Sequence, residues 1–206
     1  PIPGDNGLRV VSPTVLELKR INSKASATSA VDSWDFVANG TLNAPAASKF
    51  VVTVNGLPAS VSGVGFKRRP LYAPLAVRML RIENSLYLKL AAPVPDGATV
   101  AVLNPDLSLW PATMLFTAQA HALRYSPAIH VNQEGYMPAL AKKGSVGYYL
   151  GNLGEMDIPA GAGFQIVDAA TGAVAFTGTL TARPDTGWTY SATPYQKVYE
   201  ADFSAF

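Results

Sequence analysis

The side chains of this chain best suited to binding chemistry are aromatic residues in loop-forming sequence. A flat aromatic ring can stack on the C–H face of a sugar, whose hydroxyl groups then bind polar neighbours. Trp188, Tyr190 and Tyr195 lie within eight positions of one another. Gly187 and Pro194 favour a loop there, and a loop favours exposure. Three uses stay open for this cluster: contact with a neighbouring domain, sugar binding, or core packing.

Three more aromatic residues are candidates for sugar contact in the first half of the chain. Trp34 lies between two aspartates, Trp110 precedes a proline, and Tyr72 lies between two prolines. A single Trp in a small β-sandwich is most often part of the core. Sugar contact and core packing therefore both stay open for these residues.

Hydrolytic chemistry would require two carboxyl groups that face each other across a sugar. The closest acidic pairs are Asp32 with Asp35 and Glu155 with Asp157. Pairs at such spacing are usually solvated loops or caps. No Gly-x-Ser-x-Gly sequence is present to expose a serine nucleophile. We therefore expect no catalytic residue and no enzymatic activity in this chain.

Metal-binding residues are equally scarce. The chain has no cysteine and only two histidines, His121 and His130, so neither a thiolate site nor a three-histidine site can form. No acidic loop has the spacing of a calcium-binding hand motif. The sequence predicts no metal and no cofactor, and a structural role for His130.

The charge balance and the lack of a long apolar stretch argue against two kinds of partner. The 16 basic and 14 acidic residues give a net charge of +2, and the longest basic run is Lys67-Arg68-Arg69. Such a weak positive field would not hold a polyphosphate backbone, so we expect no nucleic acid as a partner. No apolar stretch approaches the roughly 20 residues that span a membrane, so no membrane contact is expected.

Period-two hydrophobicity dominates the chain and predicts half-buried strands. Asn55-Gly56 and Asp96-Gly97 are turn sequences between such runs. Ala112 to Leu123 could be read as a helix, but strand plus loop is preferred. Strands that recur at short spacing are typical of antiparallel sandwiches. The alternating apolar residues are Leu16 and Leu18; Phe50, Val52 and Val54; and Leu86, Leu88 and Leu90.

The predicted fold is all-β, with two tandem antiparallel β-sandwiches of the immunoglobulin-like kind. The 206 residues are enough for two small domains, and 49% hydrophobic with 15% charged residues indicates a folded chain. The turn at Ser126-Pro127 suggests the boundary. We expect one domain at residues 1–126 and a second at residues 127–206.

The second domain carries a resemblance to a known family. From Ile129 to Pro138 the chain reads Ile-His-Val-Asn-Gln-Glu-Gly-Tyr-Met-Pro, and a lysine-bearing segment follows. Residues 129–206 resemble the immunoglobulin-like domain that precedes the catalytic domain of family 9 glycoside hydrolases, the cellulases. The later segments that share its order are Lys142-Lys143-Gly144, Val146–Leu150, Asp168–Gly172 and Val198–Ser204.

Two features depart from the family pattern. The stretch from Asp185 to Gln196 is longer than that pattern, and the chain ends at Phe206 before two further strands that the family domain normally has. The chain also begins at Pro1 without a methionine, so we expect it to be a processed or excised piece.

The resemblance implies the accessory region of a secreted, polysaccharide-degrading enzyme. The expected partners are a β-glucan or related plant polysaccharide and the catalytic domain of the same polypeptide, and the expected location is secreted or extracytoplasmic. Residues 1–126 would be an accessory β-sandwich module with possible carbohydrate binding. The alternative is a structural spacer or adhesion domain that binds no carbohydrate.

Overall fold

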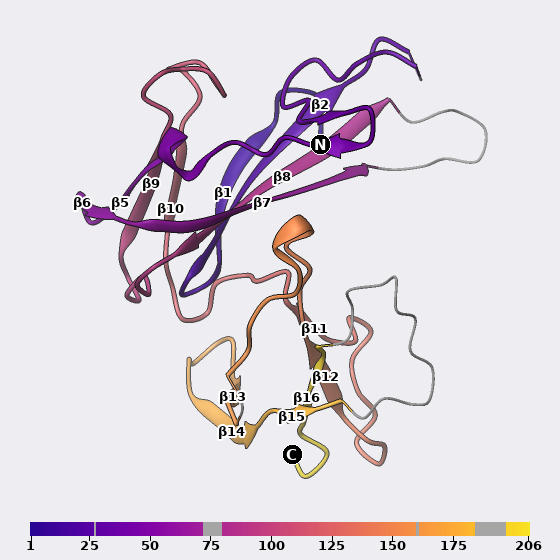
Figure 1. Cartoon of the computed structure of the whole chain (residues 1–206). Coiled ribbons are helices and arrows are strands. Elements are labelled where there is room, and N and C mark those ends of the chain that lie inside the picture. The colour runs from indigo at the N-terminus through magenta and orange to yellow at the C-terminus, as the bar shows by residue number, and fades with distance from the viewer. Residues whose placement is uncertain (27, 72–79, 160, 184–196) are drawn as a thin grey trace. The chain divides into compact units, whose positions relative to one another are not determined.

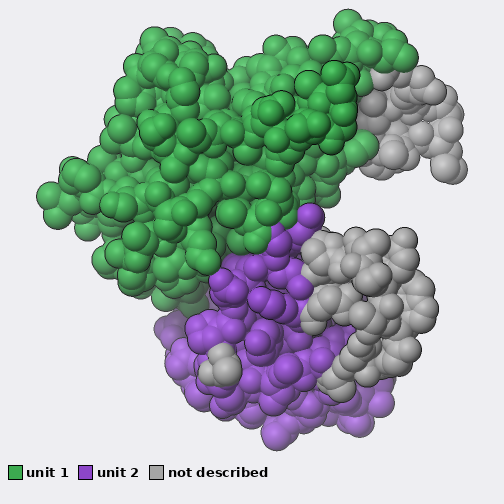
Figure 2. All heavy atoms as spheres, viewed as in Figure 1, with its two compact units in different colours: residues 1–126, 150–153 green, residues 127–149, 154–206 purple. Residues whose placement is uncertain are grey.

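The described chain forms two compact units (Figures 1 and 2). The structure is a computed structural model that describes residues 1–26, 28–71, 80–159, 161–183 and 197–206. The first unit comprises residues 1–126 and 150–153, and the second comprises residues 127–149 and 154–206. Residues 150–153 thus belong to the first unit, whereas the sequence predicts them in the second domain. That the units are independent domains stays a prediction.

The first unit contains two four-stranded antiparallel sheets. One has the order β1-β2-β8-β7, formed by β1 (Asn6–Ser12), β2 (Val15–Ser23), β8 (Arg81–Leu90) and β7 (Val61–Pro70). The other has the order β10-β9-β5-β6, formed by β10 (Phe116–Gln119), β9 (Thr99–Leu103), β5 (Val51–Val54) and β6 (Leu57–Ala59). The smaller elements are β3 (Val37–Ala38), β4 (Thr41–Leu42) and the 3₁₀ helices η1 (Ala47–Lys49) and η2 (Gly151–Leu153).

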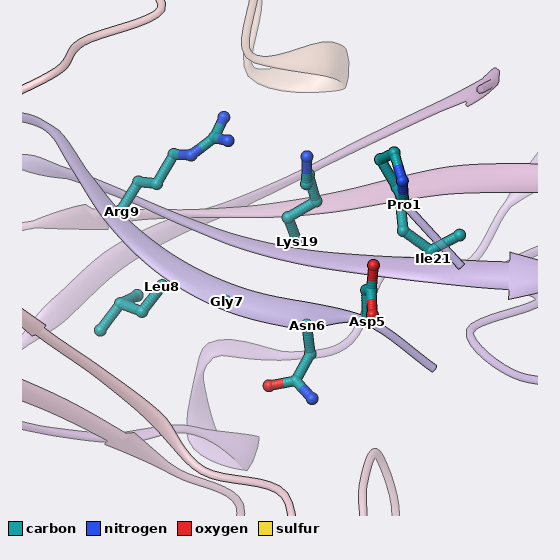
Figure 3. A pocket seen from close by; sticks show the side chains of 8 residues that line it. All are labelled: Pro1, Asp5, Asn6, Gly7, Leu8, Arg9, Lys19 and Ile21. Carbon is teal, nitrogen blue, oxygen red and sulfur yellow. The ribbon is translucent and has the colours of Figure 1, made fainter. Parts of the chain in front are cut away.

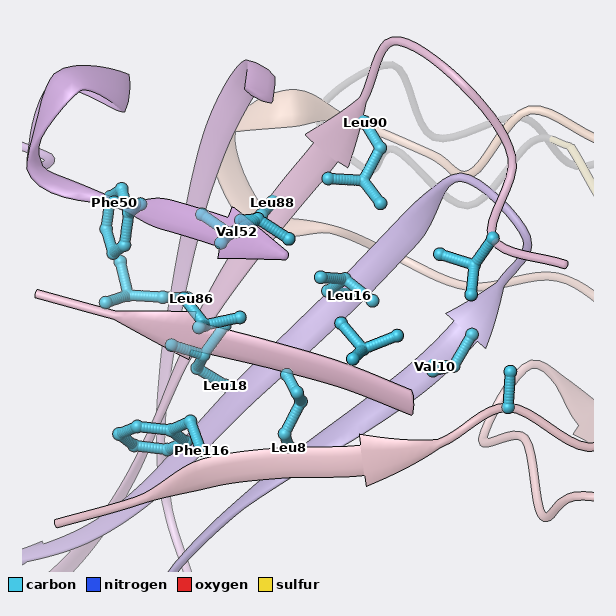
Figure 4. Packing of buried hydrophobic residues seen from close by; sticks show 14 of the residues in the cluster. Leu8, Val10, Leu16, Leu18, Phe50, Val52, Leu86, Leu88, Leu90 and Phe116 are labelled. Carbon is cyan, nitrogen blue, oxygen red and sulfur yellow. The ribbon is translucent and has the colours of Figure 1, made fainter. Parts of the chain in front are cut away.

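The core of the first unit lies between these two sheets. Leu16 pairs with Leu88 and Leu18 with Leu86 across β2 and β8, and all four are fully buried. Val52, on β5, adds to the same cluster from the other sheet (Figure 4). The period-two alternation is confirmed at these strands, because every second side chain enters the core. The prediction of a half-buried strand is wrong for β8, where Glu83, Ser85 and Tyr87 on the opposite face are buried as well.

Turn chemistry also agrees with the sequence. Asn55 and Gly56 join β5 to β6 with φ angles of 50° and 79°, the left-handed pair that a two-residue hairpin needs. Residues 112–123 contain strand β10 flanked by loops. The preference for strand over helix in that segment is therefore confirmed.

The second unit is also antiparallel. Its four-stranded sheet has the order β11-β12-β16-β15, and a separate hairpin joins β13 to β14. Asp168 accepts hydrogen bonds from Ala170 and Thr171 in the hairpin loop, where Gly172 has a φ of 74°. The all-β fold is confirmed. The strands are β11 (Ile129–His130), β12 (Lys143–Val146), β13 (Gly163–Val167), β14 (Val174–Thr179), β15 (Thr181–Ala182) and β16 (Tyr199–Asp202).

Residues 150–153 cover β7, the outermost strand of its sheet. The side-chain oxygen of Asn152 accepts a hydrogen bond from the backbone N–H of Phe66 at 2.7 Å. A Cβ atom on Gly65 would lie 2.5 Å from the carbonyl oxygen of Leu150, and one on Gly151 only 1.9 Å from that of Phe66. Both glycines are therefore required by close backbone approach, which protects an otherwise open edge.

We expect Gly151→Ala to destabilise the first unit by about 3 kcal/mol or more, because the new methyl group collides with β7 and the backbone is left-handed. Gly151 has a φ of 66°. Denaturant unfolding followed by Trp fluorescence would measure the change.

Gly154→Ala is the matched control. Gly154 has a φ of 79°, but a Cβ there meets nothing within 4 Å. Its cost should be about 1 kcal/mol, the backbone strain alone. Equal losses in the two variants would show that contact with β7 does not hold residues 150–153.

Candidate functional site

The two tryptophans proposed for sugar contact in the first unit lie in its core. Trp34 and Trp110 are each 4% exposed. The ring of Trp110 lies 4.9 Å from that of Phe116 in an edge-to-face contact. Trp34 donates a hydrogen bond from Nε1 to the carbonyl oxygen of Leu109 at 2.8 Å. Since neither indole face is open to solvent, the structure places both residues in core packing and not in a sugar site.

The other four aromatic candidates lie outside the described residues. Trp188, Tyr190 and Tyr195 fall within residues 184–196, and Tyr72 falls within residues 72–79. Their role in carbohydrate binding stays a prediction.

The acidic pair of the first unit belongs to a structural network. Asp32 accepts a hydrogen bond from Asn22, and Asn22 in turn accepts one from Asn84. Asp35 forms an ion pair with Arg68 at 2.8 Å, which holds the pKa of that carboxyl below its usual value. Burial raises the pKa of Asp32, but its hydrogen-bond donors outweigh burial and lower it. A general acid needs a raised pKa, so this pair is unsuited to that task.

Both members of the second acidic pair contact Lys197. Glu155 accepts a hydrogen bond from the backbone N–H of Lys197 at 2.8 Å, and Asp157 lies 3.6 Å from its ammonium group. The Nε2 atom of His130 lies 3.3 Å from the carbonyl oxygen of Gly147, which is a contact that a structural histidine makes.

The described part of the chain contains neither a cluster of metal-ligating side chains nor a helix that could span a membrane. Across residues 1–26, 28–71, 80–159, 161–183 and 197–206, no three metal-ligating side chains come together. Within those same ranges, no helix has the length and apolar character that crossing a membrane requires.

The motif that carries the family resemblance forms a structural turn in the second unit. The side chain of Asn132 bonds Gly135 and Glu134, and Gly135 has a φ of 99°. The hydroxyl of Tyr136 accepts from the backbone N–H of Asn132 and donates to the carbonyl oxygen of Lys143 at 2.7 Å. Tyr136 therefore fastens the turn to strand β12.

Lys142, in the lysine-bearing segment, is a second fastening point. It is only 6% exposed. Its ammonium group donates to the carbonyl oxygens of Pro138 at 3.0 Å and of Ser204 at 3.2 Å, and its backbone N–H bonds the Ser204 hydroxyl. The turn and the C-terminal segment are thus joined through one buried cation.

Comparison with known proteins agrees with this structure. The second unit is therefore an antiparallel, immunoglobulin-like β domain, and hydrogen bonds from its opening turn hold it together. Residues 124–206 match the family model of the cellulase N-terminal ig-like domain. No curated protein and no solved structure matches the chain. The match confirms the resemblance inferred for residues 129–206, and domains of that family are accessory regions of cellulases.

We expect Lys142→Met to destabilise the second unit by about 1–2 kcal/mol, because two carbonyl oxygens lose a charged donor. Calorimetry of the whole chain, in which the two units can give separate transitions, would measure it.

Lys143→Met is the control at the next residue. Lys143 is 47% exposed and pairs with Glu200 at 2.9 Å. That pair is screened by solvent, so the loss should be clearly smaller. A larger effect at Lys143 than at Lys142 would contradict the fastening role.

Proposed function

We propose that this chain is the non-catalytic accessory region of a secreted, cellulase-like glycoside hydrolase. Its task is to position or stabilise the catalytic domain of the same polypeptide. The observation that carries the proposal is the family match over residues 124–206. The structural contacts of both acidic pairs support a non-catalytic role, because these carboxyl groups hold loops in place.

Four exposed apolar side chains near the start of the second unit offer a place for domain contact. Ile129 and Val131 are 56% and 55% exposed, and Met137 and Leu140 are 68% and 60% exposed. We call these four residues the apolar surface. Exposed apolar side chains that gather within one short segment often mark an interface. Burying them against the catalytic domain would stabilise both partners.

In the parent polypeptide, we expect Met137→Ser with Leu140→Ser to lower the melting temperature of the catalytic domain by a few degrees, since buried apolar area is lost. Differential scanning calorimetry would record it. The control is Leu57→Ser with Leu107→Ser in the first unit, two leucines that are 71% and 55% exposed. A shift of the same size in the control would count against the apolar surface as the contact.

The proposal also includes binding to a β-glucan or related plant polysaccharide. The candidates are Trp188, Tyr190, Tyr195 and Tyr72, since Trp34 and Trp110 are committed to the core. A module that holds the enzyme on an insoluble polymer raises the effective substrate concentration near the active site.

The second candidate function is a structural spacer or adhesion domain. The burial of Trp34 and Trp110 favours it for the first unit, because two aromatic residues there serve packing and not recognition.

Sedimentation with insoluble cellulose and xylan separates these functions. We expect the chain to bind, and Trp188→Ala with Tyr190→Ala to lose at least about tenfold in affinity, because each stacked ring contributes roughly 1 kcal/mol. Tyr125→Ala with Phe206→Ala removes two other exposed aromatic residues as a control. If the unaltered chain binds neither polymer, the spacer is the better account.

A further inference from the structure

The outer face of the β1-β2-β8-β7 sheet carries a strong excess of positive charge. Side chains that pair across these strands, or alternate along them, share the face opposite the core. Tyr87 pairs with Glu17 and Gly65 and is fully buried, and residues 150–153 pack against Gly65, so the centre of this face is covered. We call this surface the basic face. Its charged residues are six cations, Arg9, Lys19, Lys67, Arg69, Arg81 and Lys89, and two acids, Glu17 and Glu83.

This concentration of charge is local. The whole chain has 16 basic and 14 acidic residues, so the 10 basic and 12 acidic residues elsewhere are net negative. An anionic ligand would therefore be attracted to the basic face although the net charge of the chain is close to zero.

The two carboxylates of the basic face lie beneath its cations. Glu17 is 1% exposed and lies 3.5 Å from Arg9, which is 37% exposed. Glu83 lies 3.4 Å from Lys19 and 2.8 Å from Arg69, whose side chains are 22% and 59% exposed. A ligand that approaches this face meets the cations first, while the buried carboxylates hold those cations in place.

Both carboxylates are themselves well supported. Ser85 and Tyr87 donate hydrogen bonds to Glu17 at 2.9 and 3.1 Å. Burial raises the pKa of Glu83, but the hydrogen bond from Arg69 and the charge of Lys19 outweigh burial and lower it. Glu83 therefore stays ionised, and the arrangement of its cations persists at neutral pH.

A hollow of about 290 Å³ opens at one end of the basic face. Gly7 forms its floor, since it pairs with Lys19 and has no side chain to fill the space. Arg9 and Lys19 project to the same side, whereas Leu8 points to the other (Figure 3). Pro1, Asn6, Ile21 and the acidic residue Asp5 also line the hollow, near the chain start. The volume is close to the lower limit for a small-molecule site, which suits one sugar ring.

We propose that the basic face binds an acidic polysaccharide, with the carboxylate of one uronate unit in the hollow between Arg9 and Lys19. The ligand class rests on the proposed function, whereas the charge and the hollow are observed independently of it. A polyuronate carries one carboxylate per sugar ring. Nucleic acid carries its charge far more densely, about one per 1.7 Å of duplex, and the two acids within the face disfavour it.

Affinity electrophoresis of the whole chain tests this proposal, with polygalacturonate in the gel and its fully methyl-esterified form as the neutral comparison. We expect retardation by the acidic polymer alone, falling as salt is added. Arg9→Gln with Lys19→Gln should weaken binding roughly tenfold, because two partly exposed charge contacts are lost. Lys49→Gln with Lys197→Gln makes the same change in net charge at residues that are not part of the four strands of the face, and should bind normally.

Gly7→Val provides a variant that alters no charge. A Cβ on Gly7 meets nothing within 4 Å, so the side chain should be tolerated and should fill the hollow. We expect weaker binding to polygalacturonate with an unchanged melting temperature. Normal binding by both Gly7→Val and the Arg9/Lys19 variant would overturn the proposal.

Two further outcomes are decisive. Equal retardation by duplex DNA at the same salt concentration would show that the face binds polyanions in general and does not select uronate, and this would overturn the proposal. Binding to cellulose or xylan without binding to polygalacturonate would overturn this inference and leave the proposed function intact. The reverse result would support the basic face and reject the β-glucan ligand.

Discussion

The register between β2 and β8 is the constraint on which the first unit depends. Nine consecutive residues of β2 pair with β8 in unbroken register, from Val15 opposite Lys89 to Ser23 opposite Arg81. This pairing puts leucines on the inner face and charged side chains on the outer one. Because side chains alternate along a strand, a slip by one residue would expose the leucines and bury the lysines. Core formation and the surface charge pattern are therefore fixed by the same set of backbone hydrogen bonds.

The second unit depends more on hydrogen bonds between loops and strands. Among its described residues, few apolar side chains are buried, and its sheet includes two strands of only two residues. Asn132, Tyr136 and Lys142 supply what a larger core would otherwise provide, since each satisfies backbone groups at the ends of segments. This arrangement explains why the residues that carry the family resemblance are a turn and a lysine and not a catalytic set.

The sequence was sufficient for the features that are local. The alternation at Leu16 and Leu18 predicted strand β2, and Asn55-Gly56 predicted the hairpin, because both signals lie within a few residues. Trp34 was ambiguous, since burial depends on partners as distant as Leu109. The basic face was missed because its cations come from four strands and the longest basic run in the sequence has only three residues. Strand pairing brings them together, and pairing is not visible in a single sequence.

The cover that residues 150–153 provide for β7 makes the first unit discontinuous along the chain. Its final contribution lies 24 residues beyond Ser126, after strands β11 and β12 of the second unit. During synthesis, the edge of β7 stays open until that later segment has left the ribosome, so the N-terminal unit cannot finish folding first. For the same reason, proteolysis between Ser126 and Leu150 would release a first unit with an unprotected strand, which is the kind of edge from which aggregation begins.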